Sequence, residues 1–339
     1  MGSSSDLKAA GTPVAPPTSA GAIPKRNRLL QLLRWLIFFA VSSGIAHRIW
    51  IEKEKIASYP LALHPGWILL SMVCYFAGMT GCAFFWWLAL RDLGGAPSFL
   101  NTSYAYFAGH LGKYVPGKGL VIIIRAALVR GPGVRPADAA FTSVLETFFL
   151  MSVGALVCLP VFVWAPLPHR SVLLCISLVF ALTFGAAVAP PVASNARSWL
   201  ARIFPAIESG KSCRWKTLGR GLLLMLSTWG FCGLSLLLVF QSMSGLSLLY
   251  ARMGFLRLWA IMTASVAFAT IAGFVSLTPG GLGTREWILI ETLGPFIGTP
   301  QVMLAAGIVR LQWIFTELLA GSVLWYFDRQ WTHHRKRSN

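Results

Sequence analysis

Long hydrophobic runs alternate with short polar connections from residue 29 to residue 327. A helix needs about 20 apolar residues to cross the hydrocarbon core of a bilayer, and most of the runs reach this length. The pattern therefore predicts an all-α polytopic membrane protein with about seven spanning helices. The expected spans are residues 29–47, 66–90, 136–160, 171–192, 220–242, 256–277 and 301–327.

Two further stretches combine a short apolar run with helix-breaking residues. In residues 98–130 a Gly/Pro segment precedes the run Leu120–Leu128, and in residues 279–298 a similar segment precedes the run from Trp287 to Ile297. A run of roughly 10–12 residues rises only about 18 Å as a helix, which is half a bilayer. We therefore expect two re-entrant or broken helical units. The residues expected to break them are Pro116, Gly117, Pro279, Gly280, Gly281 and Gly283.

Basic residues cluster in three segments outside the apolar runs. They lie before residue 29, within residues 193–220 and at the C-terminal end. Cytoplasmic loops carry an excess of Lys and Arg, so both termini and the 193–220 loop are expected to be cytoplasmic. This orientation requires the 256–298 unit to enter and leave on the outer side, while the first broken unit enters from the cytoplasm. Such opposed units would form an inverted repeat, as in many transporters.

The ends of the chain differ in composition from the hydrophobic middle. Residues 1–28 are rich in Ser, Ala, Gly and Pro and are expected to form a disordered cytoplasmic tail. Residues 29–327 form the expected transmembrane domain, and residues 328–339 form a basic C-terminal tail. The expected location is the cell membrane, inner or plasma, with several crossings.

Composition excludes several classes of protein. Hydrophobic residues make up 56% of the 339 residues and charged residues only 12%, which is unlike a soluble enzyme, a disordered chain or a secreted disulfide scaffold. The formal net charge of +18 would suggest nucleic acid in a soluble protein. Here much of the positive charge lies in loops and tails. We therefore expect contact with anionic lipid and no binding of nucleic acid. The six cysteines have no CxxC spacing, and no metal or cofactor is expected.

The first broken unit carries positive charge close to its break. Lys113 and Lys118 flank the Pro-Gly pair, and Arg125 lies in the following short run. A helix N-terminus attracts anions, so this unit is expected to bind a phosphate head group. The alternative is a surface turn with snorkelling lysines. Arg125 lies among apolar residues, which is costly without a partner or water.

The second broken unit carries Arg285 and Glu286 directly after its glycines. Thr284 is expected to cap the short helix, and Glu286 in the first turn would complement the helix dipole. This capping role and a role in ligand binding are both open for Glu286. Arg285 is the expected ligand contact.

Three isolated charges lie inside apolar helices: Glu146, Arg310 and Glu317. Such residues usually face a polar cavity or one another. We expect the two carboxylates to face one central cavity, with Arg310 as a charge partner, and to bind a head group or take up a proton. The alternative is a buried pair that fixes helix packing.

The two Gly/Pro motifs resemble the signatures of a known family. Residues 112–117 read Gly-Lys-Tyr-Val-Pro-Gly, and residues 279–286 read Pro-Gly-Gly-Leu-Gly-Thr-Arg-Glu. They resemble the two signatures of the lysylphosphatidylglycerol synthase transmembrane region family, the flippase-like domain of the multiple peptide resistance factor, in its stand-alone form. Glu146 falls where that family often has an acidic residue, although Thr147 follows it where the family often has Arg. The resemblance covers about residues 29–327.

The resemblance implies a flippase-like transporter that binds an anionic phospholipid or a polyprenyl-phosphate-linked lipid at the paired broken helices. It implies translocation rather than lipid synthesis, because 339 residues leave no room for a soluble aminoacyltransferase domain. Two other hypotheses stay open. One is a membrane enzyme that uses Glu146 or Glu317 as general base, although no nucleophile or metal cluster supports it and no catalytic residue is assigned. The other is a non-transporting partner of envelope-assembly enzymes.

Overall fold

The computed structural model describes residue 50 and residues 63–114, 119–203, 212–243, 246–276 and 278–337. Within these residues the chain is helical and contains no strand. The predicted tail 1–28, the predicted span 29–47 and the motif residues Pro116, Gly117 and Lys118 lie outside the described residues.

Six of the described helices are long and apolar enough to cross a membrane. They confirm six of the predicted spans to within a few residues. They are α2 (Pro65–Asp92), α5 (Pro136–Trp164), α6 (Arg170–Val188), α8 (Trp215–Met243), α10 (Phe255–Val275) and α12 (Thr299–Arg337). The last helix runs on through most of the basic C-terminal residues.

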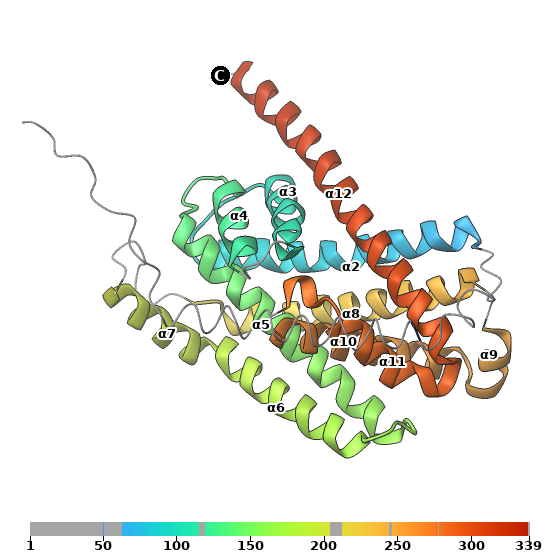
Figure 1. Ribbon diagram of the computed structural model, residues 1–339. Helices are drawn as coiled ribbons and strands as arrows, with labels where there is room; N and C mark the ends of the chain where they lie inside the picture. Colours follow the sequence, from blue (N-terminus) through green and yellow to red (C-terminus); the bar gives the residue numbers. More distant parts are fainter. Residues whose placement is uncertain are drawn as a thin grey trace, which may run out of the picture.

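Short elements make up the two broken units and the connections. The first unit consists of α3 (Phe99–His110), the 3₁₀ turn η1 (Leu111–Tyr114) and α4 (Leu120–Leu128). In the second unit, α10 is followed by the 3₁₀ turn η2 (Pro279–Gly281) and α11 (Thr284–Ile297). Two further helices, α7 (Pro190–Ile203) and α9 (Ser247–Met253), lie at opposite ends of the bundle (Figure 1).

Local sequence explains where several helices begin. Pro65 and Pro136 occupy the first turns of α2 and α5, where a missing N–H costs nothing. Ser98 caps α3, since its side chain accepts a hydrogen bond from the Asn101 N–H at 3.1 Å. At the second break Gly280 has φ 58° and Gly281 has φ 70°, a left-handed conformation that side chains other than glycine rarely adopt.

Polar contacts define two ends of the bundle. At one end Arg214 pairs with Asp92, Arg197 pairs with Asp138, and the Asn101 amide donates to Asp328. We call this the arginine-rich end. At the other end, the α9 end, the His64 N–H donates to the Ser242 carbonyl at 3.0 Å, which joins the start of α2 to the end of α8. The helices α2 and α8 therefore lie side by side along their length (Figure 1).

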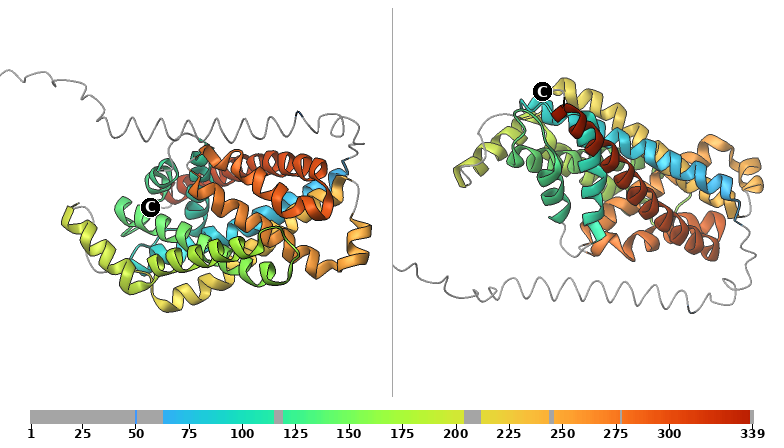
Figure 2. Two further views of the ribbon diagram at one scale, coloured as in Figure 1. Left: turned by 60° about the horizontal axis from the view of Figure 1, so that its bottom comes forward. Right: turned by 90° about the horizontal axis from the view of Figure 1, so that it is seen from above.

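The two broken units enter the bundle from opposite ends. The α3–α4 unit begins and ends at the arginine-rich end, where the Arg130 N–H donates to the Asn101 side chain at 2.7 Å. The α10–α11 unit begins beside α9 and returns toward that end. The two 3₁₀ turns contact each other inside the bundle. The helix α12 contacts both α3 and α11 and runs obliquely across the bundle (Figure 2).

Glycine allows the closest helix approach in the core. A Cβ on Gly233 of α8 would lie 2.0 Å from Thr263 Oγ1 and 2.6 Å from Thr263 Cα of α10. Small residues at such crossings let backbones pack tightly inside a membrane, where van der Waals contact drives helix association.

We expect Gly233→Ala to lower the melting temperature of the purified protein, since neither backbone can shift without disturbing the core. Overpacking of this kind costs about 1–3 kcal/mol. Gly307→Ala on α12 is the control, because a Cβ there meets nothing within 4 Å. Equal melting temperatures for the two variants would contradict the close approach of α8 and α10.

Candidate functional site

A cavity of about 320 Å³ lies where the two broken units meet. Its polar lining includes Tyr106, Lys113, Arg125, Glu146 and Arg285, together with the backbone of Gly280 and Gly281. Much of the remaining wall is apolar or aromatic, with Met79, Ile122, Phe148, Met151, Phe274 and Trp313 among its members. This volume lies near the lower limit for small-molecule sites. The cavity combines a charged floor with apolar walls.

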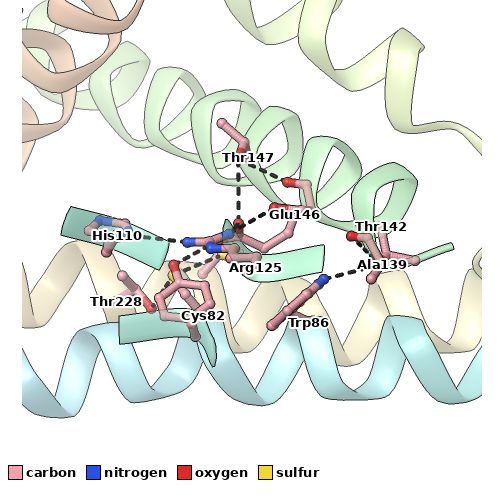
Figure 3. Close-up of polar contacts among 12 residues, drawn as sticks. Cys82, Trp86, His110, Arg125, Ala139, Thr142, Glu146, Thr147 and Thr228 are labelled. Atoms are coloured by element: carbon pink, nitrogen blue, oxygen red, sulfur yellow. Dashed lines mark hydrogen bonds and ion pairs between the residues drawn. The ribbon is translucent and has the colours of Figure 1, made fainter. Parts of the chain in front are cut away.

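Arg125 and Glu146 form a buried ion pair in this cavity (Figure 3). The Arg125 Nη1 lies 2.8 Å from Glu146 Oε2, and the two side chains are 1% and 2% exposed. The guanidinium also contacts His110 Nδ1 at 3.0 Å and stacks over the Tyr106 ring at 3.8 Å. The Tyr106 hydroxyl donates to the Glu146 carboxylate at 3.1 Å. Because of these contacts, burying the two charges costs much less free energy than burying isolated ions in the hydrocarbon would.

Each broken unit packs its arginine against a glycine of its own first helix. A Cβ on Gly109 would lie 2.4 Å from Arg125 Cγ, and a Cβ on Gly273 would lie 2.8 Å from Arg285 Cγ. Gly281 also packs closely against Arg285, because a Cβ added to Gly281 would lie 2.9 Å from Arg285 Nε. The two units therefore share a structural device, which supports the inverted-repeat interpretation without a repeated sequence.

Lys113 and Glu317 join the first break to the last helix. Lys113 Nζ lies 2.5 Å from Glu317 Oε1, and the Tyr75 hydroxyl of α2 also donates to this carboxylate. Lys113 lines the cavity, whereas Glu317 is 0% exposed and lies behind it. The expectation that both carboxylates face one cavity is therefore wrong for Glu317, which contacts the cavity-lining Lys113 but does not line the cavity itself.

Glu286 has a structural role at the second break. Its carboxylate accepts from the Gly283 N–H at 2.7 Å, which caps α11, and also pairs with Arg310 at 2.5 Å. The prediction that Thr284 caps this helix is wrong. Gly283 occupies the cap position, and within the described residues the buried Thr284 hydroxyl has no hydrogen-bond partner.

The predicted partner of Glu146 is also wrong. Arg310 pairs with Glu286 and lines a second, smaller cavity of about 40 Å³. Spacing along one helix places Arg310 and Glu317 on the same face, but it cannot show which neighbouring helix supplies each counter-charge. The carboxylate of Glu146 instead meets Arg125 from the short helix α4.

Arg285 differs from the other cations of the site. Lys113, Arg125 and Arg310 each pair with a carboxylate. Within the described part of the chain Arg285 makes no ion pair or hydrogen bond, and its Nε is buried without an acceptor. Its side chain lines both the large and the small cavity. The cluster therefore carries one uncompensated positive charge.

The sequence prediction placed most of the site but missed its aromatic members. Lys113, Arg125, Glu146, Arg285, Gly280 and Gly281 line the large cavity, while Glu286 and Arg310 line the small one. Tyr75, Tyr106 and Trp313 were not predicted. The hydroxyl of a Tyr inside an apolar run is a weak signal, because many aromatic residues of this chain lie in such runs.

The fold and the cavity define a polytopic helical membrane protein with a charged pocket between two opposed broken hairpins. Residues 35–321 match the family described as the lysylphosphatidylglycerol synthase TM region, and the chain belongs to this family. The predicted family is therefore confirmed. Family membership and the spanning helices together support a membrane protein with a lipid-related role. A comparison with curated proteins finds no match.

We expect Glu146→Gln to destabilise the protein strongly, because Arg125 would remain buried with its counter-charge removed. Removing one partner of a buried ion pair lowers the free energy of unfolding by about 3–5 kcal/mol. Arg125→Met in the same molecule should restore much of the melting temperature, whereas Arg310→Met should not. Rescue by Arg310→Met would contradict the pairing.

Proposed function

We propose that the protein is a flippase-like transporter that binds the anionic head group of a membrane lipid in the central cavity. In this proposal the lipid moves across the membrane without chemical change. The uncompensated charge of Arg285 is the observation that carries the proposal. A monoanionic phosphate would neutralise this charge and accept hydrogen bonds from the guanidinium.

The shape and lining of the cavity support a lipid rather than a soluble anion. Apolar and aromatic side chains from several spanning helices surround the charged floor, and they would accommodate the first part of the acyl or prenyl chains. A soluble metabolite would gain little from such walls.

The arrangement of the broken units supports movement between the two membrane faces. One hairpin enters from the arginine-rich end and the other from the α9 end, and their turns meet at the cavity. Transport proteins commonly place their site where two such repeats meet, so that rocking exposes it to one side and then to the other. The cavity would then be the midpoint of the path.

The distribution of basic residues supports an orientation with the arginine-rich end in the cytoplasm. The described basic residues near this end are Arg91, Arg130, Arg135, Arg197, Arg202, Arg214, Lys216, Arg220 and Arg329. Those near the α9 end are Arg170, Arg252 and Arg257. Because cytoplasmic segments carry an excess of Lys and Arg, this distribution supports a cytoplasmic location for the arginine-rich end.

We expect Arg285→Gln to weaken the binding of phosphatidylglycerol by at least about tenfold, since a charge-assisted phosphate contact is worth about 1.5–3 kcal/mol. Binding is measured on the purified chain with dioctanoyl phosphatidylglycerol. Arg252→Gln on α9 is the matched control, because it removes one exposed charge far from the cavity. Equal binding by Arg285→Gln and the unaltered protein would reject the head-group site.

Cysteine labelling tests the orientation. Arg202→Cys should react with a membrane-impermeant maleimide only from the cytoplasmic side, and Pro166→Cys only from the outer side. Cys175 is exposed and should be replaced by Ala. Burial, together with the nearby Asp92 charge, raises the pKa of the Cys213 thiol to about 12, so it will not compete at neutral pH. Labelling of Arg202→Cys from outside would overturn the proposed orientation.

A further inference from the structure

We propose that Glu317 takes up a proton when an anionic head group draws Lys113 away from it. Lipid binding would thereby be coupled to proton binding. The inference rests on the proposed function and deepens it, because it names a co-substrate and the residue that carries it. Glu317 acts through Lys113 and is a positioning residue for the head group.

The geometry places Lys113 between the Glu317 carboxylate and the central cavity. Its ammonium lies 2.5 Å from Glu317, but its side chain also lines the cavity that holds Arg285. Lys is a compact charge on a flexible stem, so its head can move several ångströms without backbone change. It belongs to the four-residue turn η1, which lies at the first break. Lys113 is therefore able to exchange Glu317 for a phosphate.

Burial determines what then happens to Glu317. This carboxylate is 0% exposed and lies in the membrane-spanning helix α12. If the cation that faces it from η1 departs, an ionised carboxylate would be left in a low-dielectric environment, which is very costly. A neutral acid avoids this cost, and the oxygen of Tyr75 is in place to accept a hydrogen bond from it. One proton would enter from solvent for each lipid bound.

Other groups near the pair must be separated from Glu317 in any test. Within the described residues, the charged and titratable side chains around Lys113 and Glu317 include Tyr75 from α2, His110 from α3, Cys232 from α8, Arg285 from α11 and Arg310 from α12. The positive charges of the two arginines repel Lys113, and an anionic head group bound beside Arg285 would offset that repulsion. Among the rest, histidine is the side-chain type whose ordinary pKa lies nearest neutral pH, so His110 is the alternative proton acceptor to exclude.

The sign of the pH dependence follows from this exchange. Before binding, Glu317 is ionised and paired with Lys113; after binding, it is protonated. Binding therefore consumes a proton, and affinity falls as pH rises, by up to about tenfold per pH unit. A simple electrostatic site made of Arg285 alone would show no such slope.

Calorimetric titration tests the inference with the purified full chain and dioctanoyl phosphatidylglycerol. Comparison of buffers with different ionisation enthalpies counts the protons taken up, and dioctanoyl phosphatidylcholine serves as the zwitterionic control. The unaltered protein should take up about one proton per lipid bound. Glu317→Gln should bind more tightly, because Lys113 is already released, and should take up none.

Two further variants keep the result decisive. The double variant Lys113→Gln with Glu317→Gln removes both charges and should fold even if one single variant does not. The double variant should bind the lipid more weakly than Glu317→Gln does. It should also take up no proton on binding. Proton uptake that persists in Glu317→Gln or in the double variant would overturn the inference and point to His110. If Arg285→Gln leaves binding unchanged, the proposed function fails instead, whatever the proton count.

Discussion

An ionised side chain inside the hydrocarbon region is tolerated only beside a counter-charge, and this constraint organises the centre of the molecule. The carboxylates Glu146, Glu286 and Glu317 each hold a cation from another segment. Two of these pairs join neighbouring elements, α4 to α5 and α11 to α12, whereas the Lys113–Glu317 pair joins η1 to α12 across 204 residues. Together they fix how the broken hairpins meet. The cavity exists because the hairpins stop halfway and because the charges at their ends cannot face lipid.

Hydropathy predicted the fold well because a spanning helix has a length and a composition that little else shares. The bounds of α4 match the predicted run Leu120–Leu128, and the broken units fall at the predicted Gly/Pro segments. The residues of the charged cluster were also predictable, because an isolated charged residue in an apolar run usually faces the interior of the helix bundle or another charge. Arg285 was expected to contact the ligand from its place after a glycine-rich break, and it lines the cavity.

The pairing of those charges was not predictable from one sequence. Which carboxylate meets which cation depends on the crossing of α12 over both hairpins, and no local pattern encodes that crossing. For the same reason Glu146 was assigned to Arg310 rather than to Arg125. Thr284 was expected to cap α11 because its side chain suits that position. Glycine took the position instead, since the backbone there has φ 84°.

The position of α12 has a mechanical consequence. One face of this helix carries Arg310 and Glu317, and these two side chains hold α11 and the turn η1, which belong to opposite hairpins. A sliding movement of α12 along its own axis would therefore pull on both hairpins at once. Neither hairpin can tilt alone without breaking a pair of opposite charges. While both ion pairs are intact, the last helix therefore links the two hairpins mechanically.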